Sequence, residues 1–521
     1  MTSKILLVLH SHIPYVKRQG RWPFGEVWLF EAMAETYIPL LRNWNRLQEE
    51  GIKVPVTISF SPPLLEQIHS KYIHRAFVDY LHERERRALE DERWYLSQSD
   101  YAMASLANYY YRFYKDVRCD YLVEFDGNII GAAKALQDDG QFEIITTAAS
   151  HAYLPLLDLT SLRHQIFWGK KIYEKFFEAE PRGFWLPECG YFQGIEDLLV
   201  RNGFEYFFVD SHALEGGQPG NVFSASGDDN PIYEMEQFNH TGLSTYRPYK
   251  VKGRDIMVLG RNAMVSQQVW SADYGYPGDP CYREFHRQSS RSGHKYWQVT
   301  DRLNSIENKK IYDPEQARRL TQTHARDFIG SILNTGREAE NMGYRDPLIV
   351  GCYDTELFGH WWWEGIDWLD AMIRGLYAEP QLDFILPSQI SRELSEAQIF
   401  ESSWGMGGKH SVWENLETNW MWDTIRRANR EFEALDKQTL DADIRGRTYF
   451  QALRELILIE SSDWVFMVSN NLTRDYALNR FFEHYAKFTR LVNVFNSGNY
   501  NEGYERWLEY IQIEDDLLVD L

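Results

Sequence analysis

Cysteine is scarce in this chain of 521 residues. There are four, Cys119, Cys189, Cys281 and Cys352, and none of them belongs to a Cys-x-x-Cys pair. Disulfide frameworks and zinc knuckles need closely patterned cysteines, so the sequence indicates neither. We expect the thiols to be reduced and mostly buried.

Long apolar runs are also missing. No stretch approaches the roughly 18 uninterrupted apolar residues that a membrane-spanning helix requires. The apolar run at residues 4–9 is short and is followed at once by His10 and His12, which is unlike a signal peptide. The sequence therefore predicts a cytoplasmic protein with no membrane partner.

Basic residues are too few to balance the acidic ones. The chain has 55 Lys and Arg against 76 Asp and Glu, a formal net charge of -21. This charge repels phosphate backbones, so we expect no nucleic-acid partner. Aromatic residues, in contrast, are abundant, with 18 Trp, 32 Tyr and 29 Phe. Such rings can cover the apolar faces of sugars, which favours a neutral polysaccharide as the partner.

Seven short apolar runs share one pattern, because polar residues follow almost every one of them. They cover residues 4–9, 54–60, 142–147, 183–187, 206–209, 255–259 and 348–352. Apolar runs separated by helix-length segments are typical of a parallel sheet covered on both faces. In an α/β barrel the loops after the strands carry the site. An eighth run, residues 383–386, is predicted to close or flank the barrel.

Two segments depart from this alternation. Residues 64–118 are rich in charged and aromatic residues and predict a helical subdomain inserted into the barrel. Beyond residue 400 the strand pattern stops, and helical patterns cover residues 420–435, 444–459 and 475–493. We therefore predict a catalytic barrel over residues 1–400 and an all-helical C-terminal domain over residues 401–521.

One stretch has the strongest chemical pattern. LIVGCYDTELFGHWWWEG, residues 348–365, places Asp354 and Glu356 where a strand should end, before three consecutive tryptophans. Alone, it fits equally well a solvated acidic loop followed by a helix with buried tryptophans. GFWLPECGY, residues 183–191, ends another run at a lone carboxylate, Glu188. Two such carboxyl groups suit chemistry at an acetal carbon, with Glu188 as nucleophile and Asp354 as acid.

A loop rich in Gly, Ser and Asp covers residues 215–230, EGGQPGNVFSASGDDN. Such composition predicts a mobile and exposed segment. We interpret it as a lid over the site, with an ordinary surface loop as the alternative.

Several motifs resemble those of glycoside hydrolase family 57. They are HSHIPYV at residues 10–16, FWLPECGY at 184–191 and YDTELFGHWWWEG at 353–365. The resemblance extends to the branching-enzyme subgroup of that family. The motifs that carry it are EIITTAASHAYLPLL at 143–157, QVWSADYGYPGDPCYREFH at 268–286, SSWGMGGKHSVW at 402–413 and RELILIESSDWVF at 454–466. It implies an incomplete (β/α)7 barrel with an inserted helical subdomain and a helical C-terminal domain.

The resemblance also implies roles for individual residues. Glu188 resembles the catalytic nucleophile and Asp354 the general acid/base. The residues implied to contact substrate are His10, His12, His151, Asp463, Trp22, Trp270, Trp404 and Trp413. Trp404 and Trp413 flank a glycine-rich stretch, so we expect their rings to be exposed. Arg261 is predicted to hold a carboxylate in its ionised form, with a structural salt bridge as the alternative, and Tyr233 is the candidate lid tyrosine.

The implied reaction is retaining double displacement on an α-1,4-glucan, with transfer to a 6-hydroxyl that creates an α-1,6 branch. Retention predicts carboxyl groups about 5 to 5.5 Å apart. The substrate would be amylose, amylopectin or glycogen, and no cofactor is implied. A 4-α-glucanotransferase or an α-amylase is the nearest alternative. A metal-dependent polysaccharide deacetylase using His10, His12 and Asp354, and a glucan-binding scaffold without activity, are more remote.

Overall fold

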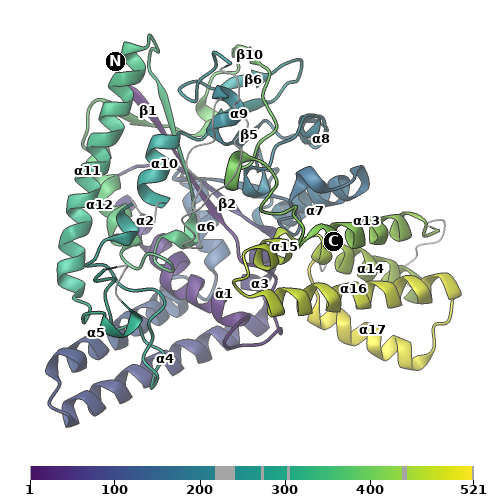
Figure 1. Ribbon diagram of the computed structural model, residues 1–521, viewed down its shortest axis with the longest axis horizontal. Coiled ribbons are helices and arrows are strands. Elements are labelled where there is room, and N and C mark those ends of the chain that lie inside the picture. The colour runs from purple at the N-terminus through teal and green to yellow at the C-terminus, as the bar shows by residue number, and fades with distance from the viewer. Residues whose placement is uncertain (1, 217–240, 271–274, 302–304, 437–442, 519–521) are drawn as a thin grey trace.

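The computed structural model describes residues 2–216, 241–270, 275–301, 305–436 and 443–518. A curled sheet runs through the centre of the molecule (Figure 1). Within the described residues its strands are β1 (Ser3–Ser11), β2 (Val56–Phe60), β3 (Phe142–Thr147), β4 (Gly183–Trp185), β5 (Tyr206–Val209), β6 (Tyr249–Val251), β7 (Met257–Gly260), β8 (Leu348–Asp354), β9 (Leu382–Phe384) and β10 (Glu396–Ala397).

The strand order is β10-β6-β7-β5-β4-β3-β2-β1-β8, with β9 paired to β1. From β7 to β8 this path holds seven mutually parallel strands, and these are the seven predicted runs. The edge strands β7 and β8 are not a ladder pair, although Asn262 N donates to Val350 O at 2.8 Å just beyond β7. The predicted incomplete (β/α)7 barrel is confirmed. The sequence did not predict β6, which is antiparallel to β7, or β10.

Helices cover the outer faces of the sheet. In the barrel they are α1 (Glu26–Ala32), α2 (Ile38–Glu49), α3 (Pro62–His69), α7 (Leu159–Phe177), α8 (Ile195–Arg201), α9 (Ser211–Glu215), α10 (Ala263–Trp270), α11 (Pro314–Asn341) and α12 (Gly365–Tyr377), and the π-helical turn η1 (Met33–Tyr37) joins α1 to α2. The Asp313 carboxylate starts α11 by accepting from two backbone N–H groups, and Pro314 occupies the first turn, where no intrahelical N–H is needed.

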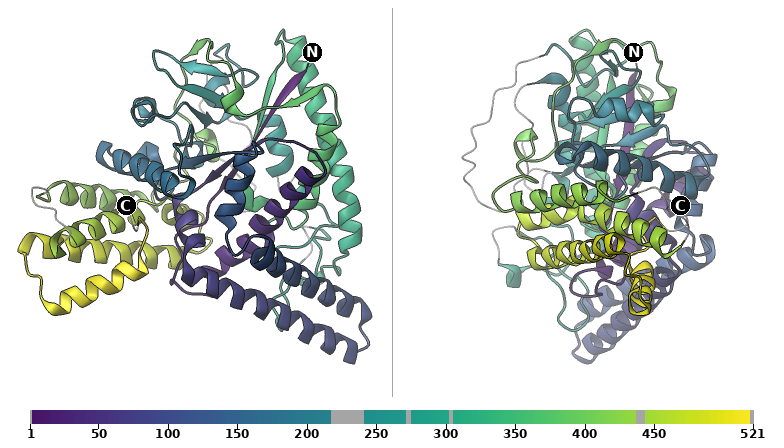
Figure 2. Two further views of the ribbon diagram at one scale, coloured as in Figure 1. Left: turned by 180° about the vertical axis from the view of Figure 1, so that it is seen from behind. Right: turned by 90° about the vertical axis from the view of Figure 1, so that its right-hand side faces the viewer.

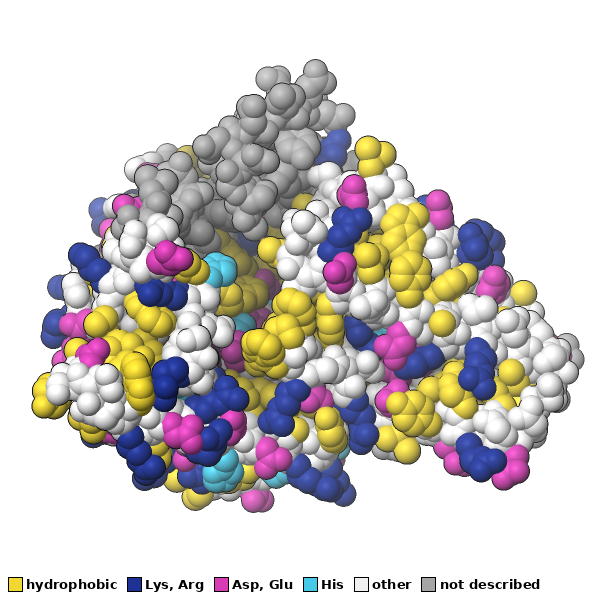
Figure 3. Space-filling view, turned by 60° about the horizontal axis from the view of Figure 1, so that its bottom comes forward, with side chains coloured by type: hydrophobic (Ala, Val, Ile, Leu, Met, Phe, Trp, Pro, Cys, Tyr) yellow, Lys and Arg dark blue, Asp and Glu magenta, His cyan; other side chains and the backbone are white. Residues whose placement is uncertain are grey.

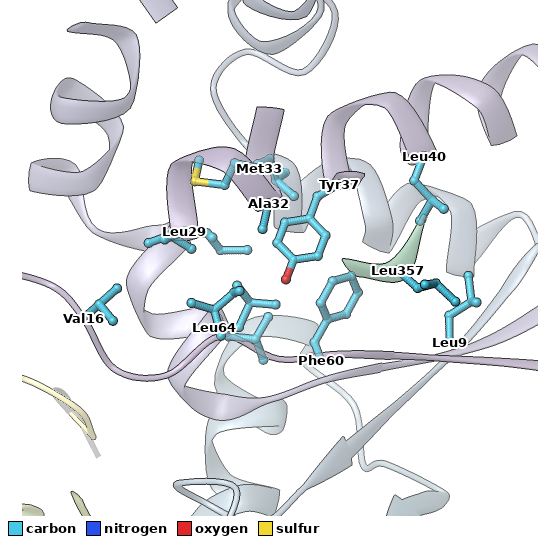
Figure 4. Packing of buried hydrophobic residues seen from close by; sticks show 14 of the residues in the cluster. Leu9, Val16, Leu29, Ala32, Met33, Tyr37, Leu40, Phe60, Leu64 and Leu357 are labelled. Atoms are coloured by element: carbon cyan, nitrogen blue, oxygen red, sulfur yellow. The ribbon is translucent and has the colours of Figure 1, made fainter. Parts of the chain in front are cut away.

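The core beneath these helices is apolar and closely packed. Figure 4 shows Leu29 and Met33 from α1 and η1 facing Phe60 and Leu64 from β2 and α3. All four side chains are buried. Burial of a side chain of this kind contributes about 1.5–3 kcal/mol, so this layer fixes α1 and η1 against the strands whose ends form the site.

The segment between β2 and β3 is helical, as predicted. It contains α4 (Lys71–Ser97), α5 (Tyr101–Cys119), the π-helical turn η2 (Asp120–Glu124) and α6 (Ile129–Asp138). Helices α4 and α5 form a long hairpin that extends from the barrel at the lower left of Figure 1. The loop at residues 282–297 packs on it, because Tyr296 Oη donates to Asp91 and Tyr110 Oη to the Lys295 carbonyl.

The C-terminal part is also helical, which confirms the predicted fold class. It contains α13 (Asn419–Glu433), α14 (Ile444–Ile459), α15 (Ser462–Ser469), α16 (Arg474–Ser497) and α17 (Glu502–Glu514). These helices lie together at one end of the molecule, on the opposite side from α11 (Figure 2). The domain boundaries at residues 64, 118 and 400 stay predictions.

Two further expectations concern cysteines and membranes. All four cysteines are free, but only Cys189 and Cys352 are buried, so the expectation of mostly buried thiols is wrong for exposed Cys119 and half-buried Cys281. None of the helices in the described residues is long and apolar enough to cross a membrane.

Candidate active site

The carboxyl ends of the barrel strands open into a cleft of about 1450 Å³. His10 and His12 reach it from β1, Glu188 from the turn after β4, and Asp354 from the end of β8. Asp463 reaches it from α15 of the C-terminal helices. Figure 3 shows this face of the molecule hollowed, with histidine and acidic side chains inside the hollow. The predicted carboxyl pair therefore shares one concave site.

Glu188 is held in an unusual backbone conformation. It lies in the short 3-10 turn η4 (Pro187–Cys189) with φ 61° and ψ 21°, and Cys189 also has a positive φ, 51°. The left-handed region costs a non-glycine residue about 1–2 kcal/mol. Strain of this kind persists where the surrounding structure enforces it, and it is enriched at active sites. Here it turns the carboxylate into the cleft.

Trp404 holds the Glu188 carboxylate. Its indole Nε1 donates to Glu188 Oε2 at 2.6 Å, and its backbone N donates to the Glu188 carbonyl at 3.0 Å. Burial raises the pKa of Glu188 to about 7, although the hydrogen bond from Trp404 opposes this shift. The negative charge of Asp463 raises the pKa further. Glu188 is thus a carboxyl group that ionises near neutral pH.

Asp354 is the second member of the pair. It ends β8, in register with His10 of the neighbouring strand β1. Burial raises its pKa well above the usual range, and the charges of Glu356 and Glu188 raise it further. A carboxyl group that keeps its proton at neutral pH is what a general acid needs.

Glu356 was noted in the sequence but was not included among the predicted site residues. It lies in the 3-10 turn η7 (Thr355–Leu357), lines the cleft and is buried. Its Oε1 accepts from the backbone N of His12 at 3.0 Å and from Tyr37 Oη. Burial raises its pKa to about 7. Its alternation with Asp354 was the signal in the sequence, so Glu356 joins Glu188 and Asp354 among the carboxyl groups that line the cleft.

Three predicted histidines form a stacked layer beside Glu188. The rings of His12 and His151 lie 3.9 Å apart, and those of His10 and His151 lie 4.9 Å apart. The Nε2 atoms of His10 and His151 are hydrogen-bonded at 2.8 Å. Burial, and then the neighbouring histidines, lower the pKa of His10 and His151 well below the usual value. Both rings are therefore neutral, and their four nitrogens are bonded to each other, to Ser59 and to Ser462.

His12 differs from the other two histidines. Its Nε2 lies 3.1 Å from both oxygens of Asp463, and its Nδ1 is 2.8 Å from Ser61 Oγ. Burial lowers its pKa, but the charge and hydrogen bond of Asp463 outweigh burial, so the net pKa is raised. This contact ties the C-terminal helices to the barrel at the site.

The predicted tryptophans differ in exposure. Trp404 lines the cleft, and Trp22 lines it while its side chain is 77% exposed. The ring of Trp270 lies 6.2 Å from that of Trp404. For Trp413 the expectation of an exposed ring is wrong. It is 1% exposed because it stacks on Tyr153 at 4.1 Å, and it does not line the cleft.

Arg261 forms a structural ion pair, which was the alternative considered for it. It contacts Asp210 at 2.8 Å, and its guanidinium lies over the Trp404 ring at 5.3 Å. Asp210 is buried, which raises its pKa, but the charge of Arg261 together with the contacts of His212 and Ser211 outweighs burial and keeps the pKa low. Arg261 therefore supports Trp404, which in turn holds Glu188. Tyr233 and most of the proposed lid lie outside the described residues.

Other residues of the cleft were not predicted from the sequence. They come from α1, α4, the loop at residues 285–295, the turn after β8 and α15, and include Trp28, Glu31, Tyr80, Phe285, Lys295, His360, Trp361 and Phe466. No local pattern distinguishes these positions, because distant segments bring them together. Trp361 belongs to the tryptophan triplet, and only this member is strongly exposed, at 43%.

The ligand set of the deacetylase alternative is not assembled. Among the described residues, one group of side chains has ligand atoms close enough to hold a metal ion, within 4.8 Å of one another. It consists of Glu455, His484 and Asp515. These belong to the C-terminal helices, not to the cleft. Both ring nitrogens of His484 are already bonded, to Glu455 and to Arg480. His10, His12 and Asp354 form no such group.

Two carboxyl groups face one cleft at the open end of a parallel half-barrel. One holds its proton and the other is ionisable, and such a pair defines a carbohydrate-cleaving type of site. The chain belongs to glycosyl hydrolase family 57, whose family model matches residues 6–403. A second family model, for the C-terminal domain of 1,4-alpha-glucan branching enzyme, matches residues 424–521.

Individual relatives agree with this assignment. The chain is 39% identical to a 1,4-alpha-glucan branching enzyme of Thermococcus kodakarensis, over 95% of this chain and 74% of the relative. It is 30% identical to a probable 1,4-alpha-glucan branching enzyme of Mycobacterium tuberculosis, over 93% and 91%.

Solved structures are similar throughout the chain. The branching enzyme of Thermococcus kodakaraensis superposes with a TM-score of 0.89 at 37% identity, covering 100% of this chain and 96% of the other. The alpha-amylase AmyC of Thermotoga maritima superposes with a TM-score of 0.85 at 31% identity, covering 100% and 98%. The two neighbours have the same fold but different printed activities.

Proposed function

We propose that this chain is a 1,4-α-glucan branching enzyme. The observation that carries the proposal is that Glu188 and Asp354 face one cleft with carboxyl groups suited to different protonation states. The match of residues 424–521 to the branching-enzyme C-terminal domain supports it, as do the named relatives.

In the first step Glu188 attacks the anomeric carbon of an α-1,4 linkage. The bond to the 4-oxygen of the next glucose breaks, and Asp354 gives its proton to that oxygen. The non-reducing segment is then covalently bound to Glu188 as an ester. Trp404 stabilises the carboxylate before attack through its 2.6 Å hydrogen bond.

In the second step a 6-hydroxyl of a glucan chain attacks the same carbon. Asp354, now ionised, takes the hydroxyl proton, and the bond to Glu188 breaks. An α-1,6 linkage forms, and both carboxyl groups return to their starting states. The acid thus acts as a base in the second half of the cycle.

The remaining predicted residues hold the donor sugar. His10 and His151 are neutral and are hydrogen-bonded within the protein, so their stacked rings form a fixed wall beside the donor sugar. Asp463 and His12 offer a charged pair at the same place. The exposed ring of Trp22 offers a stacking surface at the mouth of the cleft. We assign Trp270 a supporting role beside Trp404 and no sugar contact to Trp413.

The nearest alternatives use the same first step. A 4-α-glucanotransferase passes the segment to a 4-hydroxyl, and an α-amylase passes it to water. The similarity to AmyC makes the amylase a specific alternative. The C-terminal family match favours branching over it. The predicted lid, with Tyr233 as its candidate tyrosine, would favour transfer by excluding water.

The finer aspects of the proposal are the polymer and the location. Amylose, amylopectin and glycogen all supply α-1,4 chains with free 6-hydroxyls and are the proposed substrates. The strongly acidic composition argues against nucleic acid. A cytoplasmic location stays a prediction from the sequence, supported by four free cysteines.

The test is incubation of the purified protein with amylose, followed by counting of reducing ends before and after treatment with a debranching enzyme. For a branching enzyme, new ends appear only after debranching. Ends that rise without debranching identify the amylase. Chains that change length without either effect identify the glucanotransferase.

A further inference from the structure

The cleft extends well beyond the carboxyl pair. One part of it lies between α1, α4, the loop at residues 285–295 and the turn after β8, and we name this part the distal arm. Its lining residues are Glu31, Tyr80, Arg84, Phe285, Lys295, His360 and Trp361. The reaction steps above use none of them, although branching needs a place for a second glucan chain.

Lys295 is the most unusual group of the distal arm. The residue is 4% exposed, yet it lines the cleft, and its Nζ lies 4.2 Å from the centre of the Phe285 ring. Burial lowers its pKa. No carboxylate of the described residues lies within ion-pair distance, whereas Lys309 in the same region contacts Glu284 at 3.1 Å. Lys295 is thus a nearly buried residue whose amine reaches the cleft, where a ligand or water can accept its hydrogen bonds.

Other polar atoms of the distal arm also lack hydrogen-bond partners among the described residues. They are His360 Nδ1, Tyr80 Oη and Arg84 Nε. The His360 atom is 3.6 Å from Glu31 and 3.8 Å from Glu35, which is beyond hydrogen-bond distance. Native proteins leave few buried polar groups unpaired, and these three belong to residues that line one cavity, where a small side-chain shift would bring them to the hydroxyls of a ligand.

Aromatic rings stand beside these polar atoms. Phe285 and His360 meet edge to face at 5.6 Å, and Trp361 is 43% exposed. Rings that cover apolar faces, next to donors that satisfy hydroxyls, are the two elements that recognise a glucosyl unit.

The position of the distal arm assigns it to one side of the reaction. His360 and Trp361 follow Asp354 in the turn after β8, so they share this turn with the general acid. In a retaining mechanism the acid protonates the leaving oxygen and later deprotonates the acceptor, so both occupy the side of the acid. The distal arm is therefore on the acceptor side.

We propose that the distal arm binds the acceptor glucan chain, with Lys295, His360 and Tyr80 bonding its hydroxyls and Trp361 and Phe285 covering its sugar faces. This inference rests on the proposed branching function. It predicts that variants of the distal arm change how the enzyme uses the acceptor more than how it forms the glycosyl-enzyme.

The test uses the full chain, a fixed amount of amylose as donor, and an end-labelled maltooligosaccharide as acceptor at varied concentration. Branched labelled product is quantified as the enlarged labelled material that returns to the size of the free acceptor on debranching. Lys295→Met removes the amine at similar length, and Trp361→Ala removes an exposed ring. We expect each variant to raise the acceptor concentration for half-maximal branching by about tenfold, which high acceptor concentration overcomes. Lys170→Met, which removes a lysine on α7 outside the cleft lining, is the matched control and should behave as wild type.

Each outcome decides the inference. An unshifted acceptor curve in both variants would overturn it. So would a lower maximal rate at an unchanged half-maximal concentration, because that pattern assigns the distal arm to the chemical step or to folding. A wild-type chain that makes no branches would overturn the proposed function and the acceptor assignment together. A branching wild type with unshifted variants overturns the acceptor assignment alone.

Discussion

Two groups of acidic residues withdrawn from solvent have opposite surroundings in this molecule. One is the set of carboxyl groups in the cleft, formed by half-buried Glu188 and Asp354 and by buried Glu356. The other, in the C-terminal helices, contains Glu455 and Asp515. Burial raises the pKa of Glu455, as it raises that of Glu188. Burial alone therefore does not distinguish a catalytic site from a structural one.

The difference lies in the nearby cations. In the C-terminal helices Lys487 contacts Asp515 at 2.6 Å and Arg480 lies 3.9 Å from it. Glu455 is hydrogen-bonded to His484, which is neutral because burial lowers its pKa well below the usual value. In the cleft no described Lys or Arg lies within 4 Å of any of the three carboxyl groups, and the only imidazole that close is His151, 4.0 Å from Glu188. The first group is neutralised by its own side chains, and the second is left to hold or release protons.

This comparison suggests a physical criterion for the site. Charges that only stabilise a fold are paired, because an unpaired buried charge destabilises it by several kcal/mol. Carboxyl groups that exchange protons with a substrate must stay unpaired, and the fold is less stable as a result. The predictions below test both halves of this statement.

The largest expected effect is on catalysis. Glu188→Gln removes the nucleophile while keeping the shape of the side chain, so amylose turnover should fall by at least about 10⁴-fold. Rates are measured as chain ends after debranching. Glu180→Gln, at an exposed surface position, is the control. Turnover within tenfold of wild type would remove Glu188 from the role of nucleophile.

The next largest effect is on stability in the other group. Lys487→Met leaves Asp515 buried without its closest cation and should lower the free energy of unfolding by about 3–5 kcal/mol. The measurement is urea denaturation. Adding Asp515→Asn should recover much of this loss, because the unpaired charge is then gone. If the single and double variants are equally unstable, the unpaired charge of Asp515 is not the cause of the lost stability.

The positions of the carboxyl groups at strand ends could be predicted from the sequence because the signal is local. An apolar run followed by a polar residue identifies a strand and the end that faces the site, and all seven predicted runs are strands of the sheet. Glu188 and Asp354 fall at two of these ends. The pattern also contained Glu356, whose importance becomes visible only through Tyr37 and His12.

Other features depend on contacts between distant segments and have no local signal. Trp413 follows a glycine-rich stretch that suggests exposure, but Tyr153 covers its ring. Lys295 lies in a loop without periodicity and is buried because that loop packs on α4 and α5. A nearby cation distinguishes the acidic group of the C-terminal helices from the carboxyl groups of the cleft. Its presence or absence likewise depends on how the chain folds.

A third prediction concerns stability as a function of pH. The usual pKa of a glutamate is 4.5, and burial raises that of Glu188 to about 7. As pH rises between these values, the unfolded chain releases this proton first, so the folded chain loses up to about 3 kcal/mol of stability. Gln cannot ionise. Glu188→Gln should therefore be more stable than wild type above pH 7 and equal to it below pH 4.5, as measured by urea denaturation across pH. A constant difference at all pH values would contradict the raised pKa.

The smallest effect concerns Trp404, whose neutral indole N–H donates a hydrogen bond to the carboxylate of Glu188. Trp404→Phe keeps an aromatic ring but removes the N–H that donates to Glu188 Oε2. This hydrogen bond lowers the pKa of Glu188, so its loss should raise that pKa and move the acid limb of the pH–rate profile to higher pH. At a fixed pH below 7 the rate should fall by about three- to tenfold. Trp270→Phe removes a neighbouring indole N–H that has no bond to Glu188 and should leave the limb in place. If both variants shift the limb equally, the effect is general to the cleft and the bond from Trp404 does not set the protonation of the nucleophile.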